Sequence, residues 1–599
     1  MAKKLECEQV LRIGGAAKQA SRTMLFATML FATMLVSIAY AQGNPLEQGW
    51  EAHTNAHGER GQNRFQFLPG NLVVSRSQYD NLPSNVKVGA ILPPDCPAAS
   101  GACGASTGAT SNGLYPGVFN NVLYDPSFGI TSRIFLDQIT PWGGYVNSLE
   151  VPNSLDHGVT STTNQLVTSF SSKSELALHL STDGRYLSFM GYVAPVNAID
   201  VSNANTPLAP DSTNPDGLTY LRAVARVDAQ GNLTFTETNA YSGNNGRAVI
   251  LNNSGNTPLF YTAGNAGNGS NPQPEGVVLG AGAQLIDALQ TTENTQSPGL
   301  PTPVASFSVT QLGAKADKVG KDDNFRGITI FNNVLYFTKD SGSNGVNTVY
   351  FVDTVGIACP KGVGLPLPGA KLPTTPLAGF NPATVSSTGL PNNMCILAGF
   401  PSTLNKSLTT PAAPATLWFA DANTLYVTDE GDGYTGGTDL YTHAAQQTTA
   451  GLQKWVFNAT TNTWQLAYTL TDGLNLGKPY TVPGYPTGTN AATGLPWGPA
   501  TDGLRNFTGR NLGAGYVAIW AITSTVSGGG DTGADPNKLV VVLDKLNNTE
   551  ATVAAKESFV ELKSARFAEV LRGVEFTPGT DLSDYESDHT PTPHTQHNR

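Results

Sequence analysis

Short hydrophobic runs separated by turn-forming residues dominate the chain from Asn63 onward. Within the runs, apolar residues alternate with polar ones or continue without interruption, and almost no segment has the 3.6-residue period of an amphipathic helix. Gly, Asn, Asp and Pro cluster between the runs, where these residue types favour tight turns. The pattern predicts an all-β fold built from short antiparallel strands.

One strand pair recurs along the sequence. Each copy has an apolar strand, an Asn-, Gly- or Asp-rich turn, a second apolar strand and a Gly/Asp-rich loop. The clearest copies are ELALHLSTDGRYLSFMGY from Glu175, RAVILNNSGNTPLFYTAG from Arg247, RGITIFNNVLYFTKDSGSNG from Arg326 and ATLWFADANTLYVTDEGDG from Ala415. Third and fourth strands follow several copies, as in LRAVARVDAQGNLTFTET from Leu221. Four antiparallel strands per repeat predict the blades of a β-propeller, because a ring of blades buries both faces of each sheet.

The two ends of the chain predict how the ring closes. Near the start, NLVVSR, RIFLDQI and SLEV read as outer strands without an inner strand. Near the end, LRGVEFTPG from Leu571 reads as an inner strand without its outer three, and it copies the opening RGITIF of an earlier repeat. One blade made from both termini would close the ring. This count gives about six blades, with seven possible because residues 480–560 are difficult to divide.

The strand pair G-I-x-x-x-x-N-x-L-Y-x-T-x-D resembles the repeats of NHL-type and related six-bladed propellers. Gly327 and Ile328, followed by Tyr336, Thr338 and Asp340, carry the pattern most clearly. The resemblance covers about a third of the chain and implies the fold rather than an activity. Propellers of this kind include lyases, lactonases, dehydrogenases and binding modules.

Charged residues are scarce and mostly acidic. They make up 13% of the chain, against roughly a quarter in ordinary domains, and the net charge is −11. Without residues 1–41 the chain has 29 basic and 43 acidic residues, a net charge of −14. An acidic surface repels phosphate groups, so we expect neither nucleic acid nor an anionic membrane surface as a partner.

Residues 1–41 have the three parts of an export signal: a basic stretch, an apolar run from Met24, and the small-x-small site Ala39-Tyr40-Ala41. A membrane anchor is the alternative, although the run is slightly shorter than the roughly 20 residues that span a bilayer. We expect cleavage before Gln42, no later membrane span, and a secreted, periplasmic or cell-envelope location. The expected organisation is a signal peptide at 1–41, a flexible lead at 42–60, one propeller domain at 61–577 with long loops at 92–118 and 357–414, and a disordered tail at 578–599.

The cysteine count favours disulfide bonds in an exported chain. Cys7 leaves with the signal, and an even number remains: Cys96, Cys103, Cys359 and Cys395. Of three possible pairings we favour the two local ones, Cys96–Cys103 and Cys359–Cys395. Each local pair brackets a Gly-, Pro- and Ala-rich excursion. Zinc is the alternative, but no C-x-x-C motif is present.

Basic residues recur at the start of the predicted inner strands, and these strands line the central channel. They are Arg247, Arg326, Arg505 and Arg572. One interpretation is an anion or carboxylate site at one mouth of the channel, because a guanidinium group offers planar, bidentate donors. The alternative is that each arginine holds a neighbouring blade in place.

Acidic loops offer a candidate calcium site, best at Asp429, Asp432 and Asp439, because Ca²⁺ prefers oxygen ligands from flexible loops. The commoner explanation of such loops is that Asp and Asn side chains form hydrogen bonds with the nearby backbone of their own turns. No cofactor is assignable, although calcium is possible. His157 after Asp156 is a candidate base or metal ligand, and Trp497 is the tryptophan we expect to be exposed, where it could stack on a sugar.

Three functions fit these observations. The leading hypothesis is an exported propeller acting as a binding or scaffold module for a small anionic ligand, a carbohydrate or a protein. The second is a hydrolase- or lyase-type enzyme acting on an anionic or carbohydrate substrate at the channel mouth. The third is an adhesion protein of the cell envelope. The catalytic residues, the ligand and the oligomeric state do not follow from the sequence.

Overall fold

The computed structural model describes a large part of the second of two compact units, Phe65–Arg599. The described residues are 65–80, 82, 84–85, 91–92, 107–108, 129–161, 163–199, 201–202, 204–207, 218–255, 257–265, 282–289, 293–294, 324–340, 345–359, 362–375, 394–434, 436–491, 494–529 and 533–582. The expected signal peptide, the lead at 42–60, Cys96 and Cys103 lie outside them.

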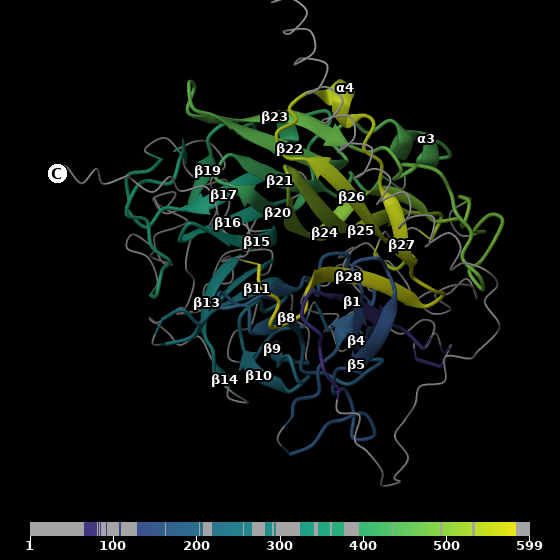
Figure 1. Cartoon of the computed structure of the whole chain (residues 1–599). Coiled ribbons are helices and arrows are strands. Elements are labelled where there is room, and N and C mark those ends of the chain that lie inside the picture. Colours follow the sequence, from purple (N-terminus) through teal and green to yellow (C-terminus); the bar gives the residue numbers. More distant parts are fainter. Residues whose placement is uncertain are drawn as a thin grey trace, which may run out of the picture. The chain divides into compact units, whose positions relative to one another are not determined.

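Six antiparallel sheets form a six-bladed β-propeller, as predicted (Figure 1). From the inner strand outward, blade 1 contains β28 (Glu569–Phe576), β1 (Leu72–Gln78), β4 (Thr131–Ile139) and β5 (Tyr145–Glu150). Blade 2 contains β7 (His179–Leu180), β8 (Tyr186–Tyr192), β9 (Arg222–Asp228) and β10 (Leu233–Thr238), with β14 (Glu293–Asn294) beside β10. Blade 3 contains β11 (Gly246–Asn252), β12 (Leu259–Gly264) and β13 (Ala283–Asp287).

The remaining blades follow the same plan. Blade 4 contains β15 (Phe325–Phe331), β16 (Val334–Lys339), β17 (Thr348–Val352), β19 (Met394–Leu397) and β18 (Val363–Gly364). Blade 5 contains β20 (Pro414–Asp421), β21 (Thr424–Asp429), β22 (Gly451–Asn458) and β23 (Thr463–Leu470). Blade 6 contains β24 (Ala500–Gly513), β25 (Tyr516–Val526), β26 (Lys538–Lys545) and β27 (Val560–Ser564). The minor elements are β2 (Ile91–Leu92), β3 (Thr107–Gly108), β6 (Thr168–Ser169), η1 (Asn405–Ser407), α3 (Leu440–Ala445) and α4 (Ala551–Ala554).

The inner strands form a closed cycle. They contact one another in the order β28, β7, β11, β15, β20, β24 and back to β28. The cycle closes within blade 1, where C-terminal β28 pairs with N-terminal β1 in a register that places Leu72 opposite Phe576. The prediction of a blade made from both termini is therefore confirmed.

A bulge in the inner strand explains the T-x-D part of the repeat. In blade 4, the Thr338 hydroxyl accepts the Gly327 N–H at 2.8 Å and donates to the Ala415 carbonyl of blade 5 at 2.7 Å. Gly327 is required because a Cβ there would lie 2.5 Å from that same carbonyl oxygen. The hydroxyl thus satisfies the bulge and joins two blades.

The same arrangement recurs in two other blades. The Ser75 hydroxyl accepts the Gly573 N–H at 2.7 Å and donates to the Leu176 carbonyl at 2.7 Å. The Thr428 hydroxyl accepts the Thr416 N–H at 3.0 Å and donates to the carbonyl of Arg505. In each of these three blades, one hydroxyl residue therefore joins the inner-strand bulge to the neighbouring blade.

The predicted Cys359–Cys395 disulfide is present, with a Cα–Cα distance of 5.8 Å. It lies within the segment 357–414 that the sequence predicts as a loop, and this segment also contains β18, β19 and η1. β19 is a strand because its four residues are apolar and buried, and they pair with β17. Within the described residues, no helix combines the length and the apolar character needed to cross a bilayer.

Candidate functional site

The four predicted arginines all lie on inner strands, beside the channel axis. Arg247 is on β11, Arg326 on β15, Arg505 on β24 and Arg572 on β28, and each lies at an irregularity of the strand pairing. All four side chains are buried. In these four strands the arginine occupies the irregular position of the pairing, so the basic residue recurs at the same place in the repeat.

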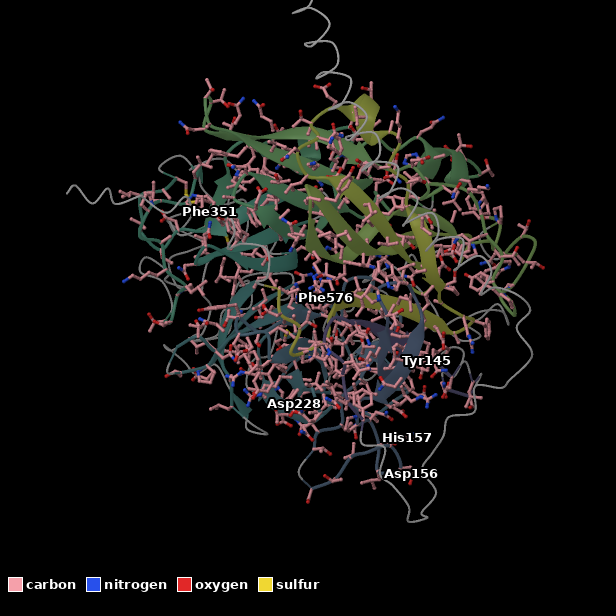
Figure 2. The ribbon with its side chains drawn as sticks, in the orientation of Figure 1. Tyr145, Asp156, His157, Asp228, Phe351 and Phe576 are labelled. Carbon is pink, nitrogen blue, oxygen red and sulfur yellow. A yellow bond between two sulfur atoms is a disulfide. The ribbon has the colours of Figure 1, made fainter. Side chains whose placement is uncertain are left out.

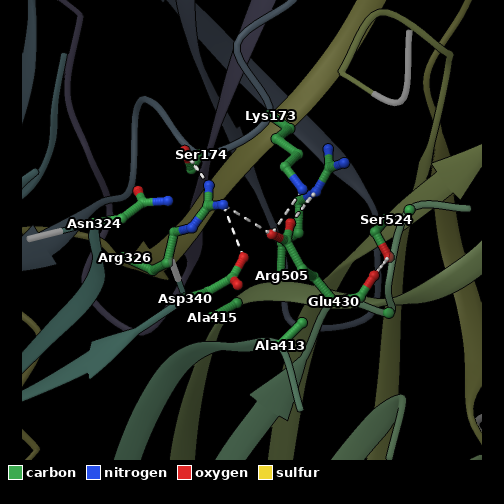
Figure 3. Close-up of polar contacts among 12 residues, drawn as sticks. Lys173, Ser174, Asn324, Arg326, Asp340, Ala413, Ala415, Glu430, Arg505 and Ser524 are labelled. Atoms are coloured by element: carbon green, nitrogen blue, oxygen red, sulfur yellow. Dashed lines mark hydrogen bonds and ion pairs between the residues drawn. The ribbon is translucent and has the colours of Figure 1, made fainter. Parts of the chain in front are cut away.

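Glu430 is the centre of the charged cluster (Figure 3). The Lys173 ammonium lies 3.1 Å from its Oε1, the Arg505 Nε 3.1 Å from its Oε2, and an Arg326 Nη 3.5 Å from Oε1. Burial disfavours the carboxylate, but the three positive charges outweigh burial and hold the pKa of Glu430 well below its ordinary value. The carboxylate therefore stays ionised.

Arg326 connects this centre to blade 4 and to the segment before β7. It forms an ion pair with Asp340 at 2.8 Å and donates to the Ser174 hydroxyl at 2.8 Å (Figure 3). Its Nε, although buried, has no hydrogen-bond partner among the described residues. The guanidinium group therefore retains one donor for another acceptor.

Arg247 and Arg572 make contacts of a different kind. Arg572 donates to the carbonyls of Phe170 and Ser172, and Arg247 donates to the Phe325 carbonyl at 3.1 Å. Arg247 thus holds the backbone of blade 4, and Arg572 holds the connection between β6 and β7. Of the four arginines, only Arg326 and Arg505 form ion pairs with Glu430.

A small cavity of about 20 Å³ lies at the centre of the cluster. Arg326, Arg505 and Arg572 line it together with Lys173 and Glu430, whereas Arg247 does not. A volume of this size holds about one water molecule. The Lys173 side chain is 30% exposed, against 3% for Glu430, so the lysine is the charged group nearest to solvent.

The three aspartates predicted to bind calcium make separate local contacts. Asp429 accepts the backbone N–H groups of Ala413 and Gly431 at 2.8 and 3.0 Å. Asp432 lies 2.7 Å from the His443 Nε2, and Asp439 accepts the Tyr434 hydroxyl at 3.0 Å. Calcium binding stays a prediction.

The described residues contain one group with metal-ligand spacing: Asp353, Cys359 and Cys395. Its two sulfur atoms are joined in the disulfide. His157 lies 3.3 Å from Glu150, and Figure 2 shows it with Asp156 on a peripheral loop. Trp497 is only 1% exposed, so the prediction that it is exposed is wrong. Its indole packs edge-on against the ring of Tyr485, which buries it beneath the surface.

Sequence reasoning missed Lys173 and Glu430. The repeat contained a signal for the glutamate: Thr428 and Glu430 occupy the positions of Thr338 and Asp340 when the two blades are aligned on the bulge-filling threonine. Both acids pair with an inner-strand arginine. No repeat position predicts Lys173, because it lies in the connection between the two-residue strands β6 and β7.

Comparisons with known proteins show limited similarity. No family model and no curated protein matches the sequence. Among solved structures, cobalt-substituted Synechocystis apocarotenoid oxygenase is similar at 9% identity, a TM-score of 0.29 and coverage of 82% of this chain and 80% of that one. Phage phi92 endosialidase is similar at 8% identity and a TM-score of 0.25, covering 72% and 53% of the two chains. Drosophila semaphorin 1a is similar at 10% identity and a TM-score of 0.23, covering 70% and 84%. These values are too low to support any statement about function.

Proposed function

We propose that this protein is an exported β-propeller that binds a small anionic ligand at the channel mouth around Lys173, Arg326 and Arg505. The observation that carries the proposal is the convergence of three cations on a single carboxylate, that of Glu430. A further cation, Arg572, lines the same cavity. Four cations line the cavity with two carboxylates, those of Glu430 and Glu175, and Arg326 also pairs with Asp340. The cations therefore exceed these three acids by one positive charge, which favours an additional anion.

Lys173 is the group through which a ligand enters. The cavity of about 20 Å³ is too small for a carboxylate or phosphate while the lysine contacts Glu430. Lys173 is also the most exposed member of the cluster, and a partly exposed ion pair contributes little stability, about 1 kcal/mol or less. Its side chain can therefore turn outward and bind the arriving anion, while the buried arginines hold it from below.

Calorimetric titration with inorganic phosphate, citrate and galacturonate tests the proposal. We expect binding of at least one anion that weakens as salt increases, and a loss of about tenfold or more in Lys173→Met, because a charged hydrogen bond is removed. Arg185→Gln is the matched control, since this exposed arginine pairs with Asp183 outside the cluster. Absence of binding, or equal weakening in both variants, contradicts the proposal. Turnover of a bound anion would instead support the enzyme hypothesis.

The export signal is the second part of the proposal. Its support is the three-part pattern of residues 1–41. Expression in the native host followed by intact-mass measurement tests it: the mature chain is expected to begin at Gln42 and to appear outside the cytoplasm. A cytoplasmic chain that retains Met1 contradicts export. The NHL-type resemblance of the repeats supports a binding role only in so far as related propellers include binding modules.

A further inference from the structure

The connection between β26 and β27, residues 546–559, links blade 6 to blade 5, and we call it the α4 segment. Its helix α4 contacts β23 of blade 5 (Figure 1). Ala554 and Phe559 are buried in an apolar cluster to which both blades contribute. The Phe559 N–H also donates to the Asp472 carbonyl, on the loop after β23, at 2.9 Å. The segment therefore straps one blade to the next.

A buried polar cluster joins the two blades beside this segment. Lys454 of β22 and Asp544 of β26 have fully buried side chains and form an ion pair at 2.7 Å. Lys454 also donates to the Lys545 carbonyl at 2.9 Å and to the Tyr468 hydroxyl at 3.0 Å. Asp544 accepts the hydroxyl of Tyr468 at 2.6 Å and that of Tyr426. One cation and one carboxylate therefore neutralise each other here.

Glu557 of the α4 segment adds a second carboxyl group to this cluster. Its Oε1 accepts the Lys545 N–H at 3.2 Å, and its side chain is hydrogen-bonded to Asp544. Its buried Oε2 receives no hydrogen bond from a donor among the described residues. Two carboxyl groups form a hydrogen bond only when one of them carries a proton. A proton on Glu557 turns the unpaired oxygen into a donor and keeps the cluster neutral.

The surroundings of Glu557 do not offset a second negative charge. The ionisable groups that face it from the neighbouring strands are Asp544 on β26, Lys454 on β22, Tyr426 on β21 and Tyr468 on β23. α4 itself has no ionisable side chain. Lys454 already pairs with Asp544, and burial raises the pKa of both tyrosines, so they stay neutral. Burial and the hydrogen bond to Asp544 raise the pKa of Glu557 to about 8.

We propose that the proton shared by Glu557 and Asp544 is a pH-sensitive latch, which holds the α4 segment against blade 5 and releases it as the pH rises. The latch shares no residue with the charged cluster at Glu430. The inference is therefore independent of the proposed anion site, and either one can fail without the other.

The direction of the switch follows from proton linkage. In the closed segment Glu557 keeps its proton up to about pH 8, whereas in a detached segment the carboxyl group returns to its ordinary pKa of 4.5. Opening therefore releases one proton between these two values. The equilibrium constant for opening rises about tenfold per pH unit from pH 5 to 8 and is constant above that range.

Rapid hydrogen exchange of the full chain between pH 5 and 9, corrected for the intrinsic rate of each amide, tests the latch. We expect the protection of residues 551–559 to fall about tenfold per pH unit up to pH 8 and then to level off. Glu557→Gln should lose this dependence, because its amide donates to Asp544 at every pH. Glu550→Gln is the matched control: it changes an exposed glutamate of the same segment and should keep the wild-type dependence.

Three results of this experiment overturn the inference. They are equal protection of the wild-type segment at pH 5 and 8, an unchanged pH dependence in Glu557→Gln, and exchange of the β25 core amides in step with the segment. The last result means that the whole domain unfolds rather than the segment alone.

Carbon-13 NMR of the glutamate carboxyl groups tests the same proton without a change at Glu557. We expect one glutamate to titrate with a midpoint near pH 8. Burial raises the pKa of Glu575 to about 7, so the signal near pH 8 must persist in Glu575→Gln. The inference also fails if no glutamate of that variant titrates near pH 8.

Discussion

Replacing Glu430 with glutamine tests the role of the charged cluster most directly. The substitution keeps the size of the side chain but removes the negative charge that Lys173, Arg326 and Arg505 share. Arg326 keeps its ion pair with Asp340 at 2.8 Å. Arg505 and Lys173, in contrast, lose the carboxylate that neutralises their positive charges in the cluster. Removing one partner of a buried ion pair costs about 3–5 kcal/mol, so we expect a decrease of that size in the free energy of unfolding.

Denaturant unfolding followed by tryptophan fluorescence measures the decrease. The control is Glu561→Gln, because Glu561 pairs with Lys538 at 2.8 Å but its side chain is 47% exposed, which limits the expected effect to about 1 kcal/mol or less. Added phosphate should stabilise Glu430→Gln more than wild type, since the anion replaces the lost charge. If Glu430→Gln is no less stable than the control, the cluster does not contribute as its geometry indicates.

Three further outcomes are expected. The free energy of unfolding should fall as pH rises from 5 to 8, because burial raises the pKa of Glu575 to about 7 and the folded state keeps a proton that the unfolded chain has lost. Denaturant unfolding at both pH values measures this fall. Glu575→Gln should reduce the slope of the free energy of unfolding against pH by about 1.4 kcal/mol per pH unit at most. Gly327→Ala should destabilise by about 1–3 kcal/mol, whereas Gly255→Ala, where a Cβ meets nothing within 4 Å, should change stability little in the same assay. Thr338→Val removes the hydroxyl that joins two inner strands and should cost about 1–3 kcal/mol by thermal or chemical unfolding, with exposed Thr460→Val showing no comparable loss.

The sequence contained the plan of the fold because each blade repeats a local pattern. Strand, turn and strand are neighbours along the chain, so residues such as Gly327 and Thr338 reveal their pairing without tertiary information. Ring closure was also predictable, because an inner strand at Leu571 had no outer strands after it. The repeat from Glu175 predicted blade 2 as well, although its inner strand β7 has only two residues.

The site was predictable only in part, because its contacts cross between blades. The arginines were visible as a recurring residue type, but Glu430, which Arg505 contacts, lies 75 residues away from it. Lys173 and Glu430 form an ion pair although more than two hundred residues separate them. Hydrophobic periodicity carries no information about such a pair. Trp497 shows the same limit, because the Pro- and Gly-rich context that suggested exposure does not reveal the ring that covers its indole.

The pairing of β1 with β28 has a consequence for biosynthesis. β1 emerges from the ribosome early, but the strand that covers its inner edge ends at Phe576, near the end of the chain. Until that point is synthesised, β1 presents an unpaired edge of backbone N–H and C=O groups, which favours pairing with other chains. A product truncated before Glu569 keeps this edge permanently. Translation must therefore pass Phe576 before the fold can cover this edge.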